Sequence, residues 1–152
     1  MTRSDARELA VHLIYAHEFS GEDPQDLVAA RLAKDYYAKL SGEVELYADR
    51  PTAAQRAYID RVVAGVTNRI SELNETISKF AIDWDVSRIS KLTRSILQLA
   101  IFETQYMEDV PTGVAISEAV RMAKLYDGDD TGAFVNGILG AYARSLPSEV
   151  QQ

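Results

Sequence analysis

The stretch IDRVVAGVTNRISELNETISKF, residues 59–80, decides the fold that this sequence predicts. Its apolar side chains recur at alternating steps of four and three residues, a spacing that places them on one stripe of a helix. These positions are Ile59, Val63, Val66, Ile70, Leu73, Ile77 and Phe80. A stripe of this kind lies against neighbouring helices, so the stretch predicts one long helix that begins after Pro51-Thr52 and packs in a bundle.

A second segment, residues 92–107, predicts the centre of that bundle. It carries apolar residues at Ile96, Leu97, Leu99, Ala100, Ile101 and Phe102. These positions cover nearly every face of a helix. A helix that is apolar all round is buried on all sides.

The rest of the chain is helical by the same criterion, and no stretch alternates convincingly with the period of a strand. Helices are expected over residues 4–19, 24–40 and 111–126, with a last helix capped by Asp130 or Thr131. Ser4 is the expected N-cap of the first helix, and Asp85 is expected to cap a short turn. About seven helices therefore predict an all-α fold in one domain, residues 1–152, with residues 41–51 as an irregular surface connection.

Composition and charge limit the function. The chain has 152 residues, no cysteine and a net charge of −7, so its overall field repels polyanions. The charge is uneven, because residues 61–100 hold six Lys and Arg against four Asp and Glu, whereas residues 101–152 hold three against eight. A nucleic-acid contact must therefore be local. The absence of a signal peptide and of a span-length apolar run predicts a cytoplasmic protein without a membrane segment.

Catalytic and metal-binding patterns are missing from the sequence. His12 and His17 are five residues apart, which places them on different faces of a helix and prevents a shared metal site. The cluster Asp127, Asp129 and Asp130 lacks the spacing and the final glutamate of a calcium loop. No glycine-rich phosphate loop is present. We therefore expect a protein that binds partners and that has no enzymatic activity, cofactor or metal.

Two pairs of residues call for an explanation. Arg3 and Arg7 lie four residues apart, on one face of the first helix. Asn136 and Gly137 lie inside the last helix, where glycine costs about 1 kcal/mol relative to alanine. That cost predicts a close approach between helices at Gly137, with Asn136 hydrogen-bonding a neighbouring loop.

Several segments carry a family resemblance. The first is Arg7-Glu8-Leu9-Ala10-Val11, followed by Trp84 and Arg88 and by SILQLAIFE at residues 95–103. The most specific are AISEAVRMAK at residues 115–124 and the order Phe134-Val135-Asn136-Gly137 after that helix. Together these segments resemble the NusB family of transcription antitermination factors. The resemblance covers most of the chain and is weakest over residues 21–58.

The resemblance implies a fold of two three-helix bundles and a function. Members of the family bind the boxA element of ribosomal RNA operons together with the ribosomal protein NusE, and help RNA polymerase to pass terminators. Carried to this chain, the RNA surface would use Arg3, Arg7 and Tyr15 of the first helix. It would also use Tyr126 and Asp130 near the start of the last helix.

One departure from the family pattern leaves an alternative open. The family's arginine-rich run is interrupted here by Ser4 and Asp5, which predicts a weaker electrostatic contribution to RNA binding. The alternative is therefore a NusB-like scaffold that binds the protein partner with weakened or lost RNA binding. A second alternative is an accessory domain of an RNA-modifying enzyme, in which another polypeptide would supply the catalysis.

Overall fold

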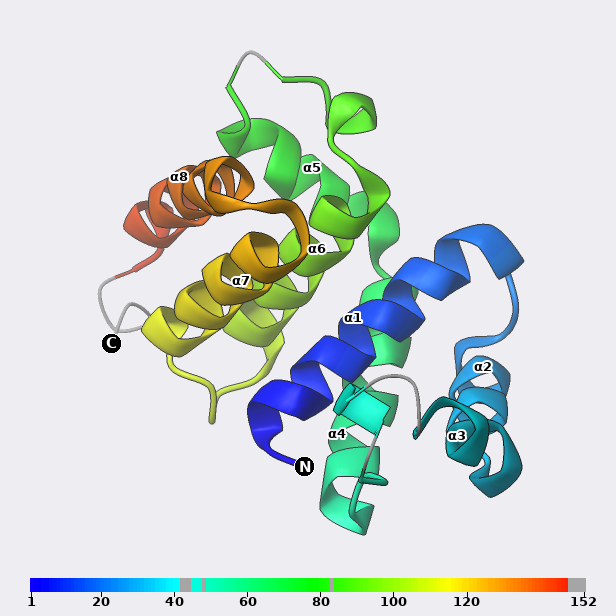
Figure 1. The fold of residues 1–152 in the computed structure, drawn as a ribbon. Coiled ribbons are helices and arrows are strands. Elements are labelled where there is room, and N and C mark those ends of the chain that lie inside the picture. Colours follow the sequence, from blue (N-terminus) through cyan, green and yellow to red (C-terminus); the bar gives the residue numbers. More distant parts are fainter. Residues whose placement is uncertain (42–44, 48, 83, 148–152) are drawn as a thin grey trace. The chain divides into compact units, whose positions relative to one another are not determined.

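The computed structural model describes residues 1–41, 45–47, 49–82 and 84–147 (Figure 1). These residues form eight α-helices and two short 3-10 helices, and they include no β-strand. They divide into two compact units, Met1–Asn68 and Arg69–Gln152. The predicted all-α fold class is confirmed.

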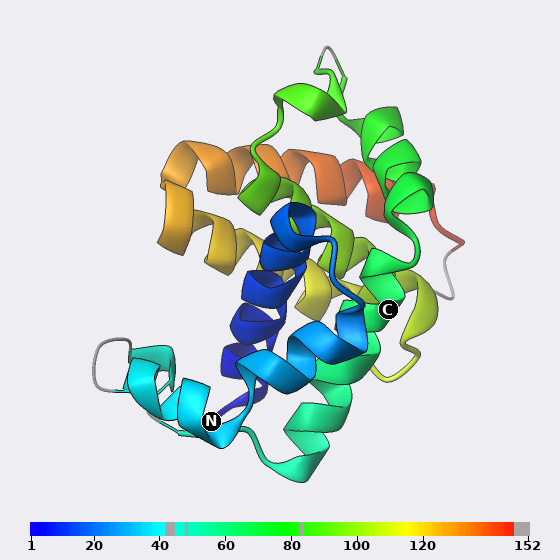
Figure 2. The ribbon, with the colours of Figure 1, turned by 90° about the vertical axis from the view of Figure 1, so that its right-hand side faces the viewer.

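The first unit is built on the pairing of α1 (Arg3–Ser20) with α4 (Ala53–Thr67). Helix α2 (Pro24–Arg31) contacts both of them, while α3 (Lys34–Ser41) lies against the short helix η1 (Glu45–Tyr47) (Figure 2). Both helices bury apolar side chains, among them Leu9 and Leu13 of α1. The apolar stripe predicted over residues 59–80 is buried in α4 at Ile59, Val63 and Val66.

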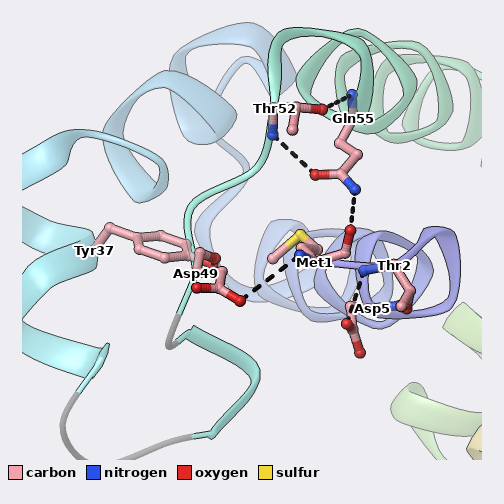
Figure 3. Close-up of polar contacts among 7 residues, drawn as sticks. All are labelled: Met1, Thr2, Asp5, Tyr37, Asp49, Thr52 and Gln55. Carbon is pink, nitrogen blue, oxygen red and sulfur yellow. Dashed lines mark hydrogen bonds and ion pairs between the residues drawn. The ribbon is translucent and has the colours of Figure 1, made fainter.

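Side-chain caps fix the beginnings of α1 and α4 (Figure 3). Thr2 and Asp5 form a reciprocal capping box, and Thr52 and Gln55 form a second one. Gln55 also donates a hydrogen bond from Nε2 to the Met1 carbonyl oxygen, which ties the two helix starts together. The Met1 ammonium lies 3.8 Å from the Asp49 carboxylate, so the segment before α4 is held to the same point.

The second unit surrounds α6 (Lys91–Tyr106). Helices α5 (Ile70–Phe80), α7 (Thr112–Asp127) and α8 (Asp129–Ser145) all contact α6, and α7 and α8 form an extensive hairpin (Figure 1). Every residue of α6 from Ser95 to Glu103 is buried. The prediction that this helix lies at the centre of its bundle is confirmed.

Two predicted helices are each divided in the structure. The expected helix over residues 24–40 breaks between α2 and α3 at Leu32, where no glycine or proline marks the break. The expected long helix breaks between α4 and α5 at Arg69, whose φ of −130° and ψ of 25° are not helical. The apolar stripe continues across this break in phase, with Val66 before it and Ile70 after it, so periodicity alone cannot reveal it.

Two helix starts also differ from the prediction. Thr2 and not Ser4 is the N-cap of α1, because Asp5 at the third helical position completes a capping box with Thr2. The last helix begins at Asp129, directly after Gly128, and not after a cap at Asp130 or Thr131. Gly128 has φ of +93°, a conformation that glycine adopts without strain. The irregular connection predicted over residues 41–51 falls partly outside the described residues. Asp85 caps the short helix η2 (Val86–Arg88) as predicted.

Candidate nucleic-acid interface

The first candidate surface, which we call the arginine patch, consists of Arg3, Arg7 and Tyr58. The two arginines are one turn apart on α1, and Tyr58 lies on the facing side of α4. The guanidinium carbon of Arg3 is 4.3 Å from the centre of the Tyr58 ring, and that of Arg7 is 5.9 Å away. Both distances are within the range of a cation–π interaction. The structure therefore brings the two predicted arginines together on one aromatic ring.

Exposure separates the two arginines. Arg3 is exposed, whereas Arg7 is only 5% exposed. Asp5 lies between them in the sequence, and its carboxylate accepts a hydrogen bond of 2.9 Å from the Thr2 N–H (Figure 3). This carboxylate therefore serves the helix cap. Arg3 is the cation that the arginine patch presents to solvent.

Tyr15 lies further along the same helix and is not part of the arginine patch. Twelve residues separate it from Arg3, which corresponds to roughly 18 Å along a helix axis. Its ring contacts the Phe19 ring edge-to-face, with 5.0 Å between the centroids. Phe19 is 60% exposed, so two neighbouring aromatic rings are open to solvent at the end of α1. Sequence reasoning identified Tyr15 and missed Phe19, although a step of four residues on a helix predicts that they are neighbours.

The second candidate surface, which we call the aromatic pocket, lies in the second unit. It is a cavity of about 340 Å³. Helices η2 and α6 and the start of α8 supply its walls. Its lining residues are Trp84, Arg88, Ile89, Ser90, Thr93, Asp127, Asp130, Thr131 and Phe134. The arrangement combines apolar rings, one cation and two carboxylates in one concave site.

Trp84 is the most accessible aromatic ring of the pocket. It is 50% exposed and contacts the Phe134 ring edge-to-face, with 5.5 Å between the centroids. The turn that carries it is fixed by Asp85, whose carboxylate accepts a 3.0 Å hydrogen bond from the Ser87 N–H. Hydrogen bonds from Ser87 hold the pKa of the Asp85 carboxyl below its usual value. A half-open indole is a suitable platform for stacking an unpaired base.

The polar side chains of the pocket favour a ligand with hydrogen-bond donors. The Asp127 carboxylate already accepts a 3.1 Å hydrogen bond from the Thr131 hydroxyl. Asp130 lines the same cavity, and Arg88 supplies a positive charge beside it. Carboxylate oxygens accept only, so they select amino or hydroxyl groups, whereas the guanidinium suits a phosphate or a carbonyl.

The comparison with known proteins identifies the family. The model of the NusB family matches residues 4–144. The chain belongs to the NusB family. The transcription antitermination protein NusB of Acetivibrio thermocellus is 39% identical over 140 residues, which cover 92% of this chain and 87% of the relative. The NusB protein of Symbiobacterium thermophilum is 34% identical over 146 residues, which cover 96% and 92%.

Solved NusB structures share the fold. NusB of T. maritima aligns with a TM-score of 0.80 at 27% identity, over 99% of this chain and 96% of its own. A structure of the antitermination factors NusB and NusE in complex with double-stranded RNA aligns with a TM-score of 0.74 over 95% and 97%. At 22% identity, the second likeness establishes the fold alone.

The two site residues predicted near the last helix are not both in the aromatic pocket. Asp130 lines the aromatic pocket. Tyr126 is exposed near the end of α7 but does not line that cavity. Sequence reasoning used Trp84, Arg88 and Phe134 only as signs of the family and missed them as site residues. An exposed tryptophan beside a capped turn was the available signal.

The prediction for Asn136 and Gly137 is wrong. Both residues are exposed on α8, and a Cβ atom added at Gly137 would meet no atom of the described chain within 4 Å. A close contact occurs instead at Gly132, five residues earlier on α8, where an added Cβ would lie 2.5 Å from Lys124 Cγ of α7. Asn136 instead lines an open groove of about 580 Å³ with residues of α7.

The described residues also bear on membranes and metals. No described helix combines the length and the apolar character that a bilayer span requires. Nowhere in the described part of the chain do three or more His, Asp or Glu side chains gather in a way that could hold a metal ion. His12 is half-buried beside Tyr47, with 3.3 Å between its Nδ1 and the tyrosine hydroxyl, and burial lowers its pKa.

Proposed function

We propose that this chain is a transcription antitermination factor that binds boxA-type RNA of ribosomal RNA operons together with the ribosomal protein NusE. In this role it helps RNA polymerase to read through terminators. One observation carries the proposal, namely the match of residues 4–144 to the NusB family together with relatives that are named antitermination proteins. The factor acts by binding, without catalysis or a cofactor, and it meets its transcripts in the cytoplasm.

The two surfaces support different parts of RNA binding. Arg3 serves the phosphate backbone, since an arginine guanidinium can pair with phosphate oxygens through two N–H groups at once. Arg7, which is 5% exposed, adds its positive charge from beneath. Tyr15, Tyr126 and the aromatic pocket serve unpaired bases, which stack on exposed rings. Asp130 is proposed to accept a hydrogen bond from a base amino group or a ribose hydroxyl. Single-stranded RNA is the ligand that uses both kinds of contact.

NusE is proposed as the protein that strengthens this binding. The chain carries a net charge of −7, so its own attraction for RNA is limited to local patches. A partner that binds the same RNA in the complex raises the affinity of the chain by linkage. Support for this partner comes from the shared fold with a NusB that was solved with NusE and double-stranded RNA.

The test is a titration of a fluorescent boxA-like single-stranded RNA with the chain alone and with the chain plus NusE. A scrambled RNA of the same length and a boxA duplex serve as controls. We expect modest binding by the chain alone, tighter binding by the complex, and a preference for the boxA single strand in both. If neither the chain nor the complex distinguishes boxA from the scrambled RNA, the proposed function fails. If NusE binds and RNA does not, the chain is a protein-binding scaffold.

A further inference from the structure

The ring of Tyr58 is the feature of the arginine patch that the proposed function leaves unexplained. Tyr58 is 4% exposed, so its face is not available to stack on a base. That face is covered by Arg3, at 4.3 Å, and is also close to Arg7, at 5.9 Å. The chain therefore uses a buried aromatic ring to hold cations.

We propose that Tyr58 is a positioning residue for RNA binding, which holds the Arg3 guanidinium flat on its ring so that the N–H edge faces a backbone phosphate. This inference rests on the proposed function. Tyr58 itself does not touch the RNA. It acts through Arg3, and Arg7 supports the stack from the buried side.

The contact with Tyr58 leaves the guanidinium donors of Arg3 available. Within the described part of the chain, Arg3 has no hydrogen-bond or ion-pair partner, and its contact with Tyr58 is the interaction that the structure records. Stacking on a ring uses the face of the guanidinium and leaves the in-plane N–H groups available. Those groups match the spacing of two phosphate oxygens.

Positioning matters because a free arginine side chain loses conformational entropy when it binds. A side chain that is already held in its bound orientation loses less, and the saving appears as affinity. Arg3 is the first residue of α1, and the Thr2–Asp5 capping box fixes the backbone at that point. The packing of α1 on α4 then sets the distance between Arg3 and Tyr58. Backbone and ring together define where the cation lies.

A simpler account is that the arginine stem merely covers an apolar ring, as long charged side chains often do. The two accounts differ in what the loss of the ring does to RNA binding. If only covering matters, a leucine at position 58 serves equally well, because the arginine stem still covers an apolar side chain. If the ring holds the guanidinium, Tyr58→Leu loses affinity although both arginines remain.

The experiment is a double-mutant cycle on the affinity of the full chain with NusE for the boxA-like RNA, measured over a range of salt concentrations. The variants are Arg3→Ala, Tyr58→Leu and the double variant, with Tyr58→Phe as the control that keeps the ring. Circular dichroism confirms that each variant folds. We expect Tyr58→Leu to weaken binding by about two- to fivefold and Tyr58→Phe to change it less than that. In the Arg3→Ala background, Tyr58→Leu is expected to have no further effect.

The outcomes separate this inference from the proposed function. If Arg3→Ala weakens binding and Tyr58→Leu does not, or if the two effects add, the positioning role is wrong while the RNA surface stands. If the chain with NusE does not bind the RNA at all, the proposed function fails and this inference fails with it. Should Tyr58→Leu not fold, Tyr58→Met takes its place as the variant that removes the ring and keeps a long apolar side chain. A loss of about two- to fivefold supports positioning, and unchanged affinity with an unchanged salt slope overturns it.

Discussion

The arginine patch and the aromatic pocket use the same kinds of side chain in opposite ways. In the arginine patch the ring is buried and the cation is exposed, since Tyr58 is covered by Arg3. In the aromatic pocket Trp84 is exposed and the charged groups line the wall beside it. A covered ring can only hold its cation, whereas an open ring can itself stack on a ligand.

Under the proposed function, this difference gives the two surfaces different parts in RNA recognition. A contact between Arg3 and a phosphate releases counterions, so its contribution falls as salt rises, and it does not depend on the base. Hydrogen bonding to Asp130 depends on the base, whereas stacking on Trp84 accepts any base and releases no counterions. Salt slope and base preference should therefore respond to different substitutions.

The largest expected effect concerns the helix that supports the aromatic pocket. Leu99 is completely buried on α6, whose N-cap Ser90 and residue Thr93 line the pocket. Leu99→Ala should lower the free energy of unfolding by about 2–5 kcal/mol, because it leaves a cavity in the core. Urea unfolding followed by the fluorescence of Trp84, the single tryptophan of the chain, measures it. Leu125→Ala is the matched control at a residue that is 62% exposed, and its effect should stay within about 0.5 kcal/mol.

The next effect tests the open ring directly. Trp84→Ala should weaken binding of the boxA-like RNA by about 1–3 kcal/mol, the value of one base stacked on an aromatic side chain. The salt slope should not change, because no charge is removed. Trp84→Phe keeps a ring and should retain most of the affinity. Unchanged affinity of Trp84→Ala would place base stacking elsewhere, with Tyr15 and Phe19 as the next rings to test.

A smaller effect is expected from the carboxylate of the pocket. Asp130→Asn keeps an acceptor oxygen and adds an N–H donor, so it should alter the preference between bases with an amino group and bases with a carbonyl at that position. We expect a change of about 1 kcal/mol in relative affinity, the net value of one hydrogen bond. Asp129→Asn is the control, because Asp129 is in the same helical turn but does not line the cavity. If the two variants changed the base preference equally, the effect would come from the loss of a negative charge and not from a hydrogen bond to Asp130.

The fold could be predicted where one chemical pattern extended over many residues. Helix α6 is apolar on every face, so its central place follows from the sequence alone. The break at Arg69 could not be predicted, because the apolar stripe from Val66 to Ile70 keeps its phase across it. Local geometry changes there without any change in the pattern of burial.

The site was less predictable because its parts are distant in the sequence. Arg3 and Arg7 are one turn apart, so their common face could be predicted, but their contact with Tyr58 depends on how α1 packs on α4. Likewise, fifty residues separate Trp84 from Phe134, and only the tertiary structure joins them. Such contacts leave no periodic signal in a single sequence.

The smallest expected effect tests why the prediction for Gly137 was wrong. Glycine weakens a helix in the same way wherever it stands, but whether it also allows close packing depends on the facing helix. Gly137 faces open space, and Gly132 lies under Lys124. Gly137→Ala should therefore raise the free energy of unfolding by about 0.5–1 kcal/mol, because it removes glycine's entropy cost and introduces no contact. Gly132→Ala should give no such gain, because its Cβ would lie 2.5 Å from Lys124 Cγ and the lysine side chain would have to move. Thermal unfolding of both variants measures these changes in stability. If Gly137→Ala were less stable than the unsubstituted chain, Gly137 would lie at a close approach between helices, as the sequence predicted.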